Sequence, residues 1–146
     1  PPRSTPSNSS AASDVYKRQG YYIEVKYVRP IPSGLNLPLP WHRGSLINDL
    51  IRLAFRTPIE SDKYILLIAS KEFITHLKNK PGFPLFAPED TWHGIIRDLI
   101  VVKTEENRIT KENKGYVNQE VIQKRLKYEV VNPLHVVLWK VMIPER

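Results

Sequence analysis

The segment Tyr21–Val28 constrains the fold of this chain more than any other. It reads Tyr-Tyr-Ile-Glu-Val-Lys-Tyr-Val, and aromatic and β-branched residues at this density favour a β-strand. Side chains alternate between the two faces of a strand, so Glu24 and Lys26 point to the same face. A carboxylate beside an ammonium can hold a divalent metal and orient a water molecule. The two side chains can also form an ordinary ion pair, and both interpretations stay open here.

A helix and a second strand follow this segment. Ser45 is a suitable N-cap for a helix over Leu46–Arg56, which Pro58 ends. The spacing predicts a buried helix face made of Leu46, Ile47, Leu50, Leu53 and Ala54. Tyr64–Ala69 is a continuous apolar run, typical of a strand covered on both faces in a parallel sheet. The order therefore predicts two parallel strands joined by a right-handed crossover.

The connection Arg29–Gly44 is rich in proline, which predicts an extended and stiff loop. Its prolines are Pro30, Pro32, Pro38 and Pro40. At its end, Trp41, His42 and Arg43 could stack on and grip nucleic acid. The alternative is a loop that a buried Trp41 anchors.

The segments after residue 70 give a less regular pattern. A short helix is predicted over Lys71–Lys80, with an apolar stripe of Phe73, Ile74 and Leu77, and a turn-rich loop over Pro81–Pro88. Asp90–Val102 is ambiguous, because it carries helix-capping residues but also Gly94. The highly charged stretch Glu105–Gly115 predicts a surface loop.

A second helix is predicted over Tyr116–Tyr128 and a final strand over His135–Ile143, with Pro133 between them. The basic flank of this helix could contact phosphate groups, or it could be a solvated face. It consists of Lys124, Arg125 and Lys127.

The composition indicates one globular α/β domain. The chain has 146 residues, of which 41% are hydrophobic and 25% charged. Its net charge is +7, which suits a polyanionic partner such as nucleic acid but also simple basic solubility. The chain has no cysteine and no apolar run long enough for a bilayer, so we expect a cytoplasmic protein without membrane contact. Its histidines show no spacing typical of a zinc site.

Residues 1–19 differ from the rest of the chain. They are rich in Pro, Ser, Ala and Asn and lack apolar periodicity, which is typical of disorder. Ser-Asp-Val-Tyr-Lys-Arg-Gln at positions 13–19 resembles a translated sequencing-adaptor remnant. We therefore expect a non-native tail over 1–19, a single domain over 20–146, and native sequence missing upstream. A native flexible tail is the alternative.

Glu24-Val25-Lys26, followed by a helix and a buried strand, resembles the second half of the PD-(D/E)XK, or restriction-endonuclease-like, nuclease fold. The resemblance covers Tyr21–Ser70, about a third of the chain. It implies a mixed sheet flanked by helices, with the N-terminal elements missing. It also implies that Glu24 and the Val25 carbonyl bind Mg²⁺, or Mn²⁺ in its place, and that Lys26 orients or polarises the attacking water.

The family also places an acidic metal ligand on the preceding strand, and here this sequence departs from the pattern. Only Asp14 lies upstream, inside the suspected remnant, and we assign it no role. On the polar side of the following helix, Asn48, Asp49, Arg52 and Arg56 could contact phosphate. The favoured alternative for these four is a solvated face with local ion pairs.

Together these features predict magnesium-dependent phosphodiester hydrolysis of DNA, with RNA less favoured, in a site that is incomplete in this fragment. One alternative is a non-catalytic module that binds nucleic acid or protein, and another is a purely structural domain. The nuclease interpretation requires Glu24 and Lys26 to open into a cleft. Ion pairing of both on an open solvent face would weaken it.

Overall fold

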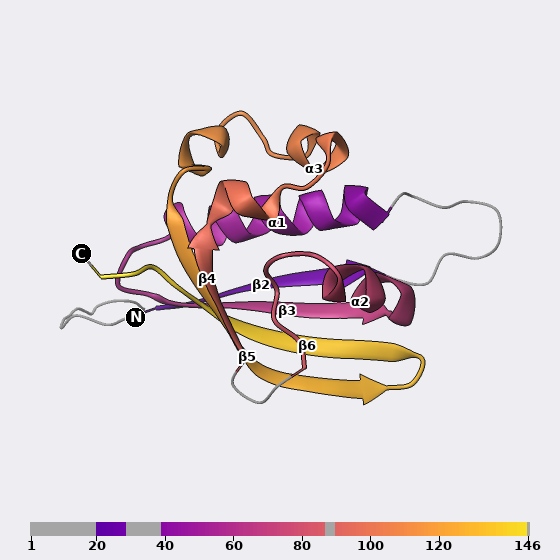
Figure 1. Cartoon of the computed structure of the whole chain (residues 1–146). Coiled ribbons are helices and arrows are strands. Elements are labelled where there is room, and N and C mark those ends of the chain that lie inside the picture. The colour runs from indigo at the N-terminus through magenta and orange to yellow at the C-terminus, as the bar shows by residue number, and fades with distance from the viewer. Residues whose placement is uncertain (1–19, 29–38, 87–89, 146) are drawn as a thin grey trace, which may run out of the picture.

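The computed structural model describes residues 20–28, 39–86 and 90–145. These residues form an α/β fold around a five-stranded mixed sheet in the order β2-β3-β6-β5-β4 (Figure 1). The strands are β2 (Tyr21–Val28), β3 (Asp62–Ser70), β4 (Thr91–Ile95), β5 (Glu120–Val131) and β6 (Leu134–Met142). The helices are α1 (Leu39–Phe55), α2 (Lys71–Lys78) and α3 (Lys103–Asn107), with 3₁₀ turns η1 (Ile96–Leu99) and η2 (Lys114–Tyr116). The predicted α/β class with a mixed sheet is confirmed.

Several sequence predictions concern residues outside the described part. They include the tail 1–19 with Asp14, and Pro30, Pro32, Pro38 and Pro88. None of the described helices is long and apolar enough to cross a membrane.

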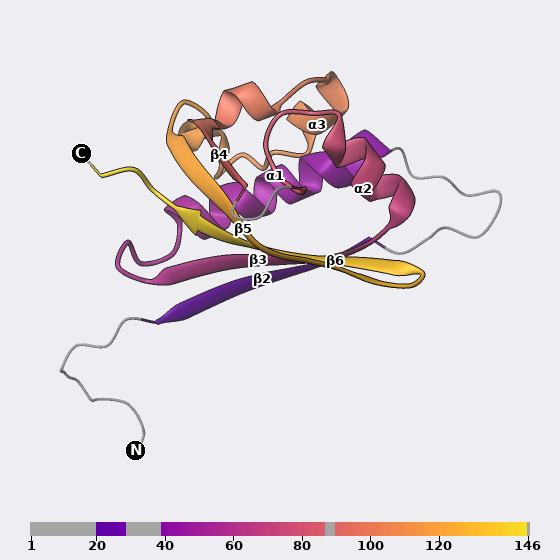
Figure 2. The same cartoon turned by 60° about the horizontal axis from the view of Figure 1, so that its bottom comes forward.

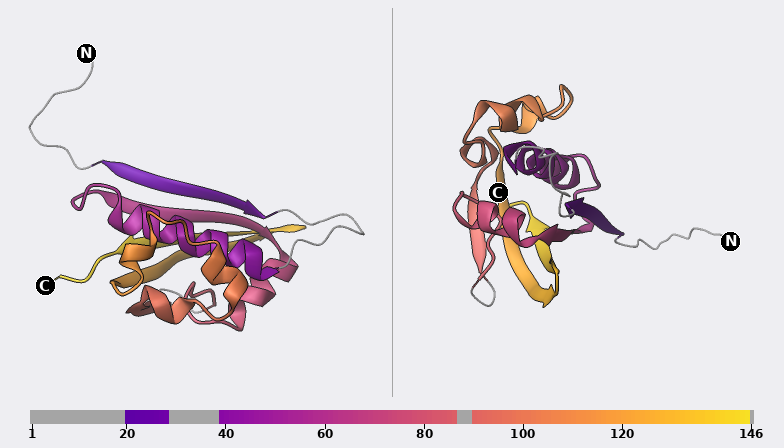
Figure 3. Two further views of the ribbon diagram at one scale, coloured as in Figure 1. Left: turned by 90° about the horizontal axis from the view of Figure 1, so that it is seen from above. Right: turned by 90° about the vertical axis from the view of Figure 1, so that its right-hand side faces the viewer.

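The predicted strand–helix–strand unit is present. β2 and β3 are parallel and in register, from Tyr21 opposite Asp62 to Val28 opposite Ala69, and α1 connects them. β6 pairs antiparallel with β3 on its other side, and β5 and β4 continue the sheet in antiparallel fashion. β2 therefore lies at one edge of the sheet, as both views in Figure 3 show.

All three helices lie on one face of the sheet (Figure 2). Side chains of β3 accordingly alternate between buried and half-buried along the strand. The prediction that β3 is covered on both faces is wrong for the described residues, because a continuous apolar run does not reveal which face is covered. The other face, which we call the open sheet face, carries Tyr21, Ile23, Val25, Tyr27, Tyr64, Leu66, Ile68, Val136 and Leu138.

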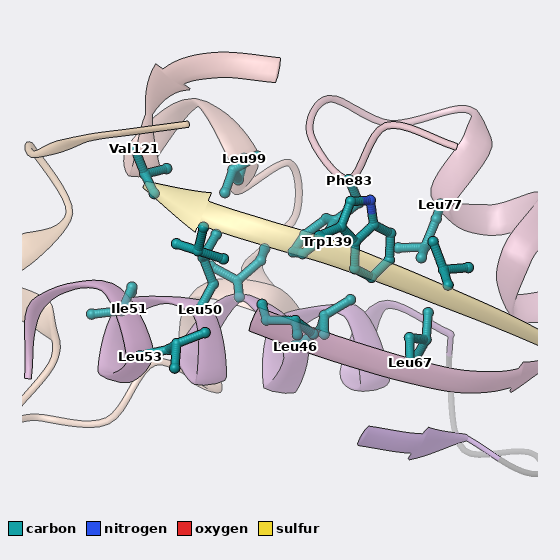
Figure 4. Packing of buried hydrophobic residues seen from close by; sticks show 14 of the residues in the cluster. Leu46, Leu50, Ile51, Leu53, Leu67, Leu77, Phe83, Leu99, Val121 and Trp139 are labelled. Atoms are coloured by element: carbon teal, nitrogen blue, oxygen red, sulfur yellow. The ribbon is translucent and has the colours of Figure 1, made fainter. Parts of the chain in front are cut away.

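Trp139 of β6 lies at the centre of the core, between α1 and the loop that carries Phe83 (Figure 4). The two rings meet edge-to-face, 5.4 Å apart, and the indole N–H donates to the Pro84 carbonyl at 2.6 Å. The apolar residues predicted for the first two helices are all buried here. They are Leu46, Ile47, Leu50, Leu53 and Ala54 of α1, and Phe73, Ile74 and Leu77 of α2.

The first helix is longer than predicted. It begins at Leu39 instead of after an N-cap at Ser45, because proline is tolerated in a first helical turn and Pro40 does not end it. Gly44 lets α1 approach α3 closely, since a Cβ there would lie 2.7 Å from Glu105 Cα. Trp41 and its neighbours therefore belong to α1 and not to a loop.

A fully buried ion pair between Arg43 and Glu105 connects α1 with the segments that contain Pro81, Leu99 and Glu105. Arg43 Nη1 lies 2.9 Å from Glu105 Oε2 and donates to the Leu99 carbonyl at 2.5 Å. Nη2 donates to the Pro81 carbonyl at 2.5 Å, and Glu105 Oε1 accepts from the Val101 N–H at 2.7 Å. Burial lowers the pKa of Arg43, and the Glu105 carboxylate opposes this effect. The prediction of a surface loop over Glu105–Gly115 is therefore wrong at its start, which belongs to α3, and at Glu105, Ile109 and Asn113, which are buried.

The helix prediction over Tyr116–Tyr128 is also wrong, because this segment contains η2 and most of β5. The ambiguous segment Asp90–Val102 contains β4 and η1. In β5 the buried residues Val121 and Gln123 alternate with more exposed neighbours, which is the period of a strand. Pairing with β6 decides the structure of this segment, and that partner is remote in the sequence. The final predicted strand, His135–Ile143, is confirmed as β6.

Replacement of Arg43 by methionine tests the buried ion pair. Arg43→Met should lower the free energy of unfolding by about 3–5 kcal/mol, because the Glu105 carboxylate stays buried without its partner. Urea denaturation measures the change. Arg56→Met is the control, since Arg56 is exposed directly after the end of the same helix and should matter by no more than about 0.5 kcal/mol. Equal effects of the two substitutions would contradict this role of Arg43.

Candidate functional site

Glu24 and Lys26 point from β2 toward α1 and remain partly open to solvent. Their side chains are 28% and 20% exposed. The alternating side chains of the strand, at Tyr21, Ile23, Val25 and Tyr27, point to the open sheet face. The predicted placement of Glu24 and Lys26 on one face of a strand is confirmed.

Four charged side chains and one hydroxyl join β2 to α1 in a continuous row, which we call the β2–α1 row. Its members in order are Glu24, Arg52, Asp49, Lys26 and Ser45. Arg52 Nη2 lies 2.5 Å from Glu24 Oε2 and 2.9 Å from Asp49 Oδ1. Asp49 Oδ2 lies 3.3 Å from Lys26 Nζ, and this ammonium also donates to Ser45 Oγ. Two carboxylates and two cations balance, so the row carries no net charge.

Helical spacing brings the α1 members of the row together. Ser45, Asp49 and Arg52 are four and three residues apart, so they lie on one face of the helix, above β2. The prediction of a solvated polar face is wrong at Asp49 and Asn48, which are 8% and 9% exposed. Asn48 Oδ1 instead accepts a hydrogen bond from Asn113 Nδ2 at 2.7 Å.

The carboxylates hold Arg52 firmly in its charged form. Partial burial lowers the pKa of Arg52, but the hydrogen bond and negative charge of Glu24, together with Asp49, outweigh it and raise the pKa.

The row offers carboxylate oxygens, which Mg²⁺ prefers as ligands, but fewer of them than Mg²⁺ requires. Glu24 and Asp49 converge on one positive charge, and carboxylate oxygens are the ligands this ion prefers. Octahedral Mg²⁺ needs about six oxygens, including waters. Within the described ranges, no three His, Asp or Glu side chains gather into a metal-binding group. Glu24 and Asp49 can supply part of a coordination sphere, and Mg²⁺ would compete with Arg52 for them.

The side chain and the main-chain carbonyl of Val25 have different surroundings. Its side chain is 58% exposed on the open sheet face, away from the row. Its main-chain carbonyl, which the nuclease resemblance implies as a second metal ligand, lies on the edge strand between Glu24 and Lys26.

The residues predicted to contact nucleic acid near the start of α1 have different surroundings. Arg43 is fully buried, so its guanidinium bonds within the fold and does not face solvent. Trp41 is half-buried, with the Arg108 guanidinium carbon 3.9 Å from the centre of its ring. Burial, Lys26 and Arg108 together lower the pKa of the neighbouring His42. Arg52 belongs to the β2–α1 row, with its side chain 43% exposed.

The predicted basic flank lies on β5 and does not form one patch. Lys124 is opposite Lys140 and Lys127 is opposite Leu138, so both belong to the open sheet face. Arg125 is opposite the buried Trp139 and belongs to the face that the helices cover, and the register shifts between Arg125 and Lys127. On a helix the three cations would lie on one flank, but on strand β5 they point to opposite faces of the sheet.

Comparison with known protein families, with characterised proteins and with solved structures finds no significant match to this chain. Its function is therefore inferred from the residues and their geometry.

The sequence pattern indicates Ser45 only as a helix cap and favours a solvated face for Asp49. Both contact Lys26. Their spacing along α1 was the available signal, because a helix that joins two parallel strands packs across the first of them. The spacing does not predict how far the helix is rotated about its own axis. The burial of Arg43 and of the apolar residues determines that rotation.

A double-mutant cycle with Glu24→Gln and Arg52→Gln tests the energetic weight of the row. The coupling should be about 0.2–1 kcal/mol, because both side chains are partly solvated. Urea denaturation of the four proteins gives the coupling. Glu106→Gln and Lys103→Gln form a matched cycle, since these two residues make an exposed pair at 3.2 Å on α3. If either Glu24→Gln or Arg52→Gln alone unfolds the protein, the expectation that this ion pair contributes little to stability is wrong.

Proposed function

We propose that this domain is part of a magnesium-dependent phosphodiesterase of the restriction-endonuclease-like type that hydrolyses DNA, with RNA the less favoured substrate. One observation carries the proposal. Glu24 and Lys26 share the α1 face of the first strand in a parallel strand–helix–strand unit, at the edge of the sheet, where both are partly open to solvent.

The described residues divide the chemistry between them. Glu24 and Asp49, with the Val25 carbonyl, would hold Mg²⁺. When bound, the ion lowers the pKa of its water and stabilises negative charge on the phosphate. Lys26 would donate a hydrogen bond to the attacking water or to a phosphate oxygen. Ser45 and Asp49 hold the ammonium in place and limit the freedom of its long side chain.

The family pattern implies one more acidic ligand than the described residues supply. Asp14 is the upstream carboxylate in this sequence, lies outside the described residues and has no assigned role. The net charge of +7 supports a polyanionic substrate. The row is therefore proposed as part of a site that a further carboxylate completes.

A non-catalytic binding module is the second candidate function, and the open sheet face supports it. Tyr21, Ile23, Val25 and Tyr27 are each more than half exposed on that face, and adjoining exposed apolar side chains mark interaction sites. Salt-sensitive DNA binding without cleavage in the presence of Mg²⁺ would favour this function over hydrolysis.

Cleavage of DNA with Mg²⁺ or Mn²⁺ tests the proposed hydrolysis. The assay uses the protein with its natural sequence restored upstream of Gly20, because residues 1–19 are expected to be foreign. Glu24→Gln and Lys26→Met should each lower kcat by about 100-fold or more, since each removes a charge held at the reacting phosphate.

Glu106→Gln and Lys103→Met are the matched controls. They make the same chemical changes in exposed residues of α3 and should leave cleavage unchanged. If Glu24→Gln and Lys26→Met cleave as fast as these controls, the two residues have no part in the mechanism.

A further inference from the structure

The outer edge of β2 has features of a strand that accepts another strand. Within the described residues, β2 pairs only with β3, and it does so over eight residues without a bulge. Edge strands are commonly protected by proline, by bulges or by charged side chains, including ones that point inward. Residues 21–28 contain no proline, and their charges, Glu24 and Lys26, both point toward α1. The edge is therefore long and regular, and these two charges decide which strand can pair with it.

We propose that two copies of this chain pair through β2, antiparallel, about a two-fold axis at Val25. The sequence of the strand is self-complementary in this register. Glu24 lies opposite the partner's Lys26, and Lys26 lies opposite the partner's Glu24. The two five-stranded sheets become one continuous sheet, and the contact is isologous, as in most homodimers.

The opposite face of the paired strands is complementary as well. Ile23 lies opposite the partner's Tyr27, and Val25 lies opposite the partner's Val25. Aromatic–β-branched and opposite-charge pairs are both favourable across antiparallel strands. Each charged side chain retains capacity for the new contact, because Arg52 binds only Oε2 of Glu24 and the Lys26 ammonium has three donors.

Neighbouring registers are disfavoured by the same residues. An axis at Glu24 places this carboxylate opposite its own copy, and an axis at Lys26 places two ammonium groups opposite each other. A shift by one residue places Glu24 and Lys26 opposite apolar side chains of the other face. The charge pattern of β2 therefore selects a single register, independently of the proposed hydrolysis.

Charge exchange tests the pairing on the full 146-residue chain. Sedimentation equilibrium should show a dimer for the unsubstituted chain, and Glu24→Lys or Lys26→Glu should each raise the dissociation constant of the dimer at least ten-fold. An equimolar mixture of these two variants should form a heterodimer, because lysines then face glutamates at all four positions. Glu106→Lys, an exposed charge reversal on α3, should leave the dimer intact.

Disulfide trapping gives an independent readout, because the chain has no cysteine of its own. Val25→Cys should cross-link two copies on oxidation, since position 25 lies on the axis. Ile23→Cys should not, since its opposite neighbour is position 27 of the partner. A monomer at all concentrations would overturn the proposal, as would a dimer that charge reversal leaves intact, a different strand found on this edge, or equal cross-linking at positions 23 and 25.

Discussion

The buried guanidinium of Arg43 is the interaction on which the rest of the structure depends. It binds the Glu105 carboxylate and the carbonyls of Pro81 and Leu99, so one side chain of α1 reaches three separate segments of the chain. A buried charge is costly unless it is paired, and Nη1 and Nη2 of Arg43 are both bonded to these segments, so moving them away from the helix would leave the charge unpaired. Arg43 thereby fixes both the position of α1 along the sheet and its rotation about its own axis.

The rotation of α1 has a direct consequence for β2. With Leu46, Leu50 and Leu53 in the core, the face that carries Ser45, Asp49 and Arg52 lies above the edge strand. Glu24 and Lys26 are then held by side chains of the helix and stay partly solvated. The proposed site and the proposed pairing both use Glu24 and Lys26. The row holds these two side chains on the α1 face, and the pairing adds hydrogen bonds along the outer edge and sets them opposite the partner's charges.

The sequence was sufficient where local pattern and tertiary context agree. Tyr21–Val28, the apolar faces of α1 and α2 and the strand of Trp139 were all predictable from period and residue type. The sequence was insufficient where a partner remote along the chain decides the local structure. Tyr116–Tyr128 became a strand because β6 pairs with it, and Glu105 became buried because Arg43 lies beside it. In the candidate site, the β2 residues were predictable, but Asp49 and Ser45 required the rotation of the helix.

Binding of Mn²⁺, followed by electron paramagnetic resonance, tests the central claim that the β2–α1 row is a site for a cation. The protein with its natural sequence restored upstream of Gly20 should bind Mn²⁺, and Glu24→Gln should lose this binding, because it removes one of the two carboxylates that converge on Arg52. Glu106→Gln should bind as the unsubstituted protein does. Equal binding by the unsubstituted protein and Glu24→Gln, or no binding by either, would contradict the account.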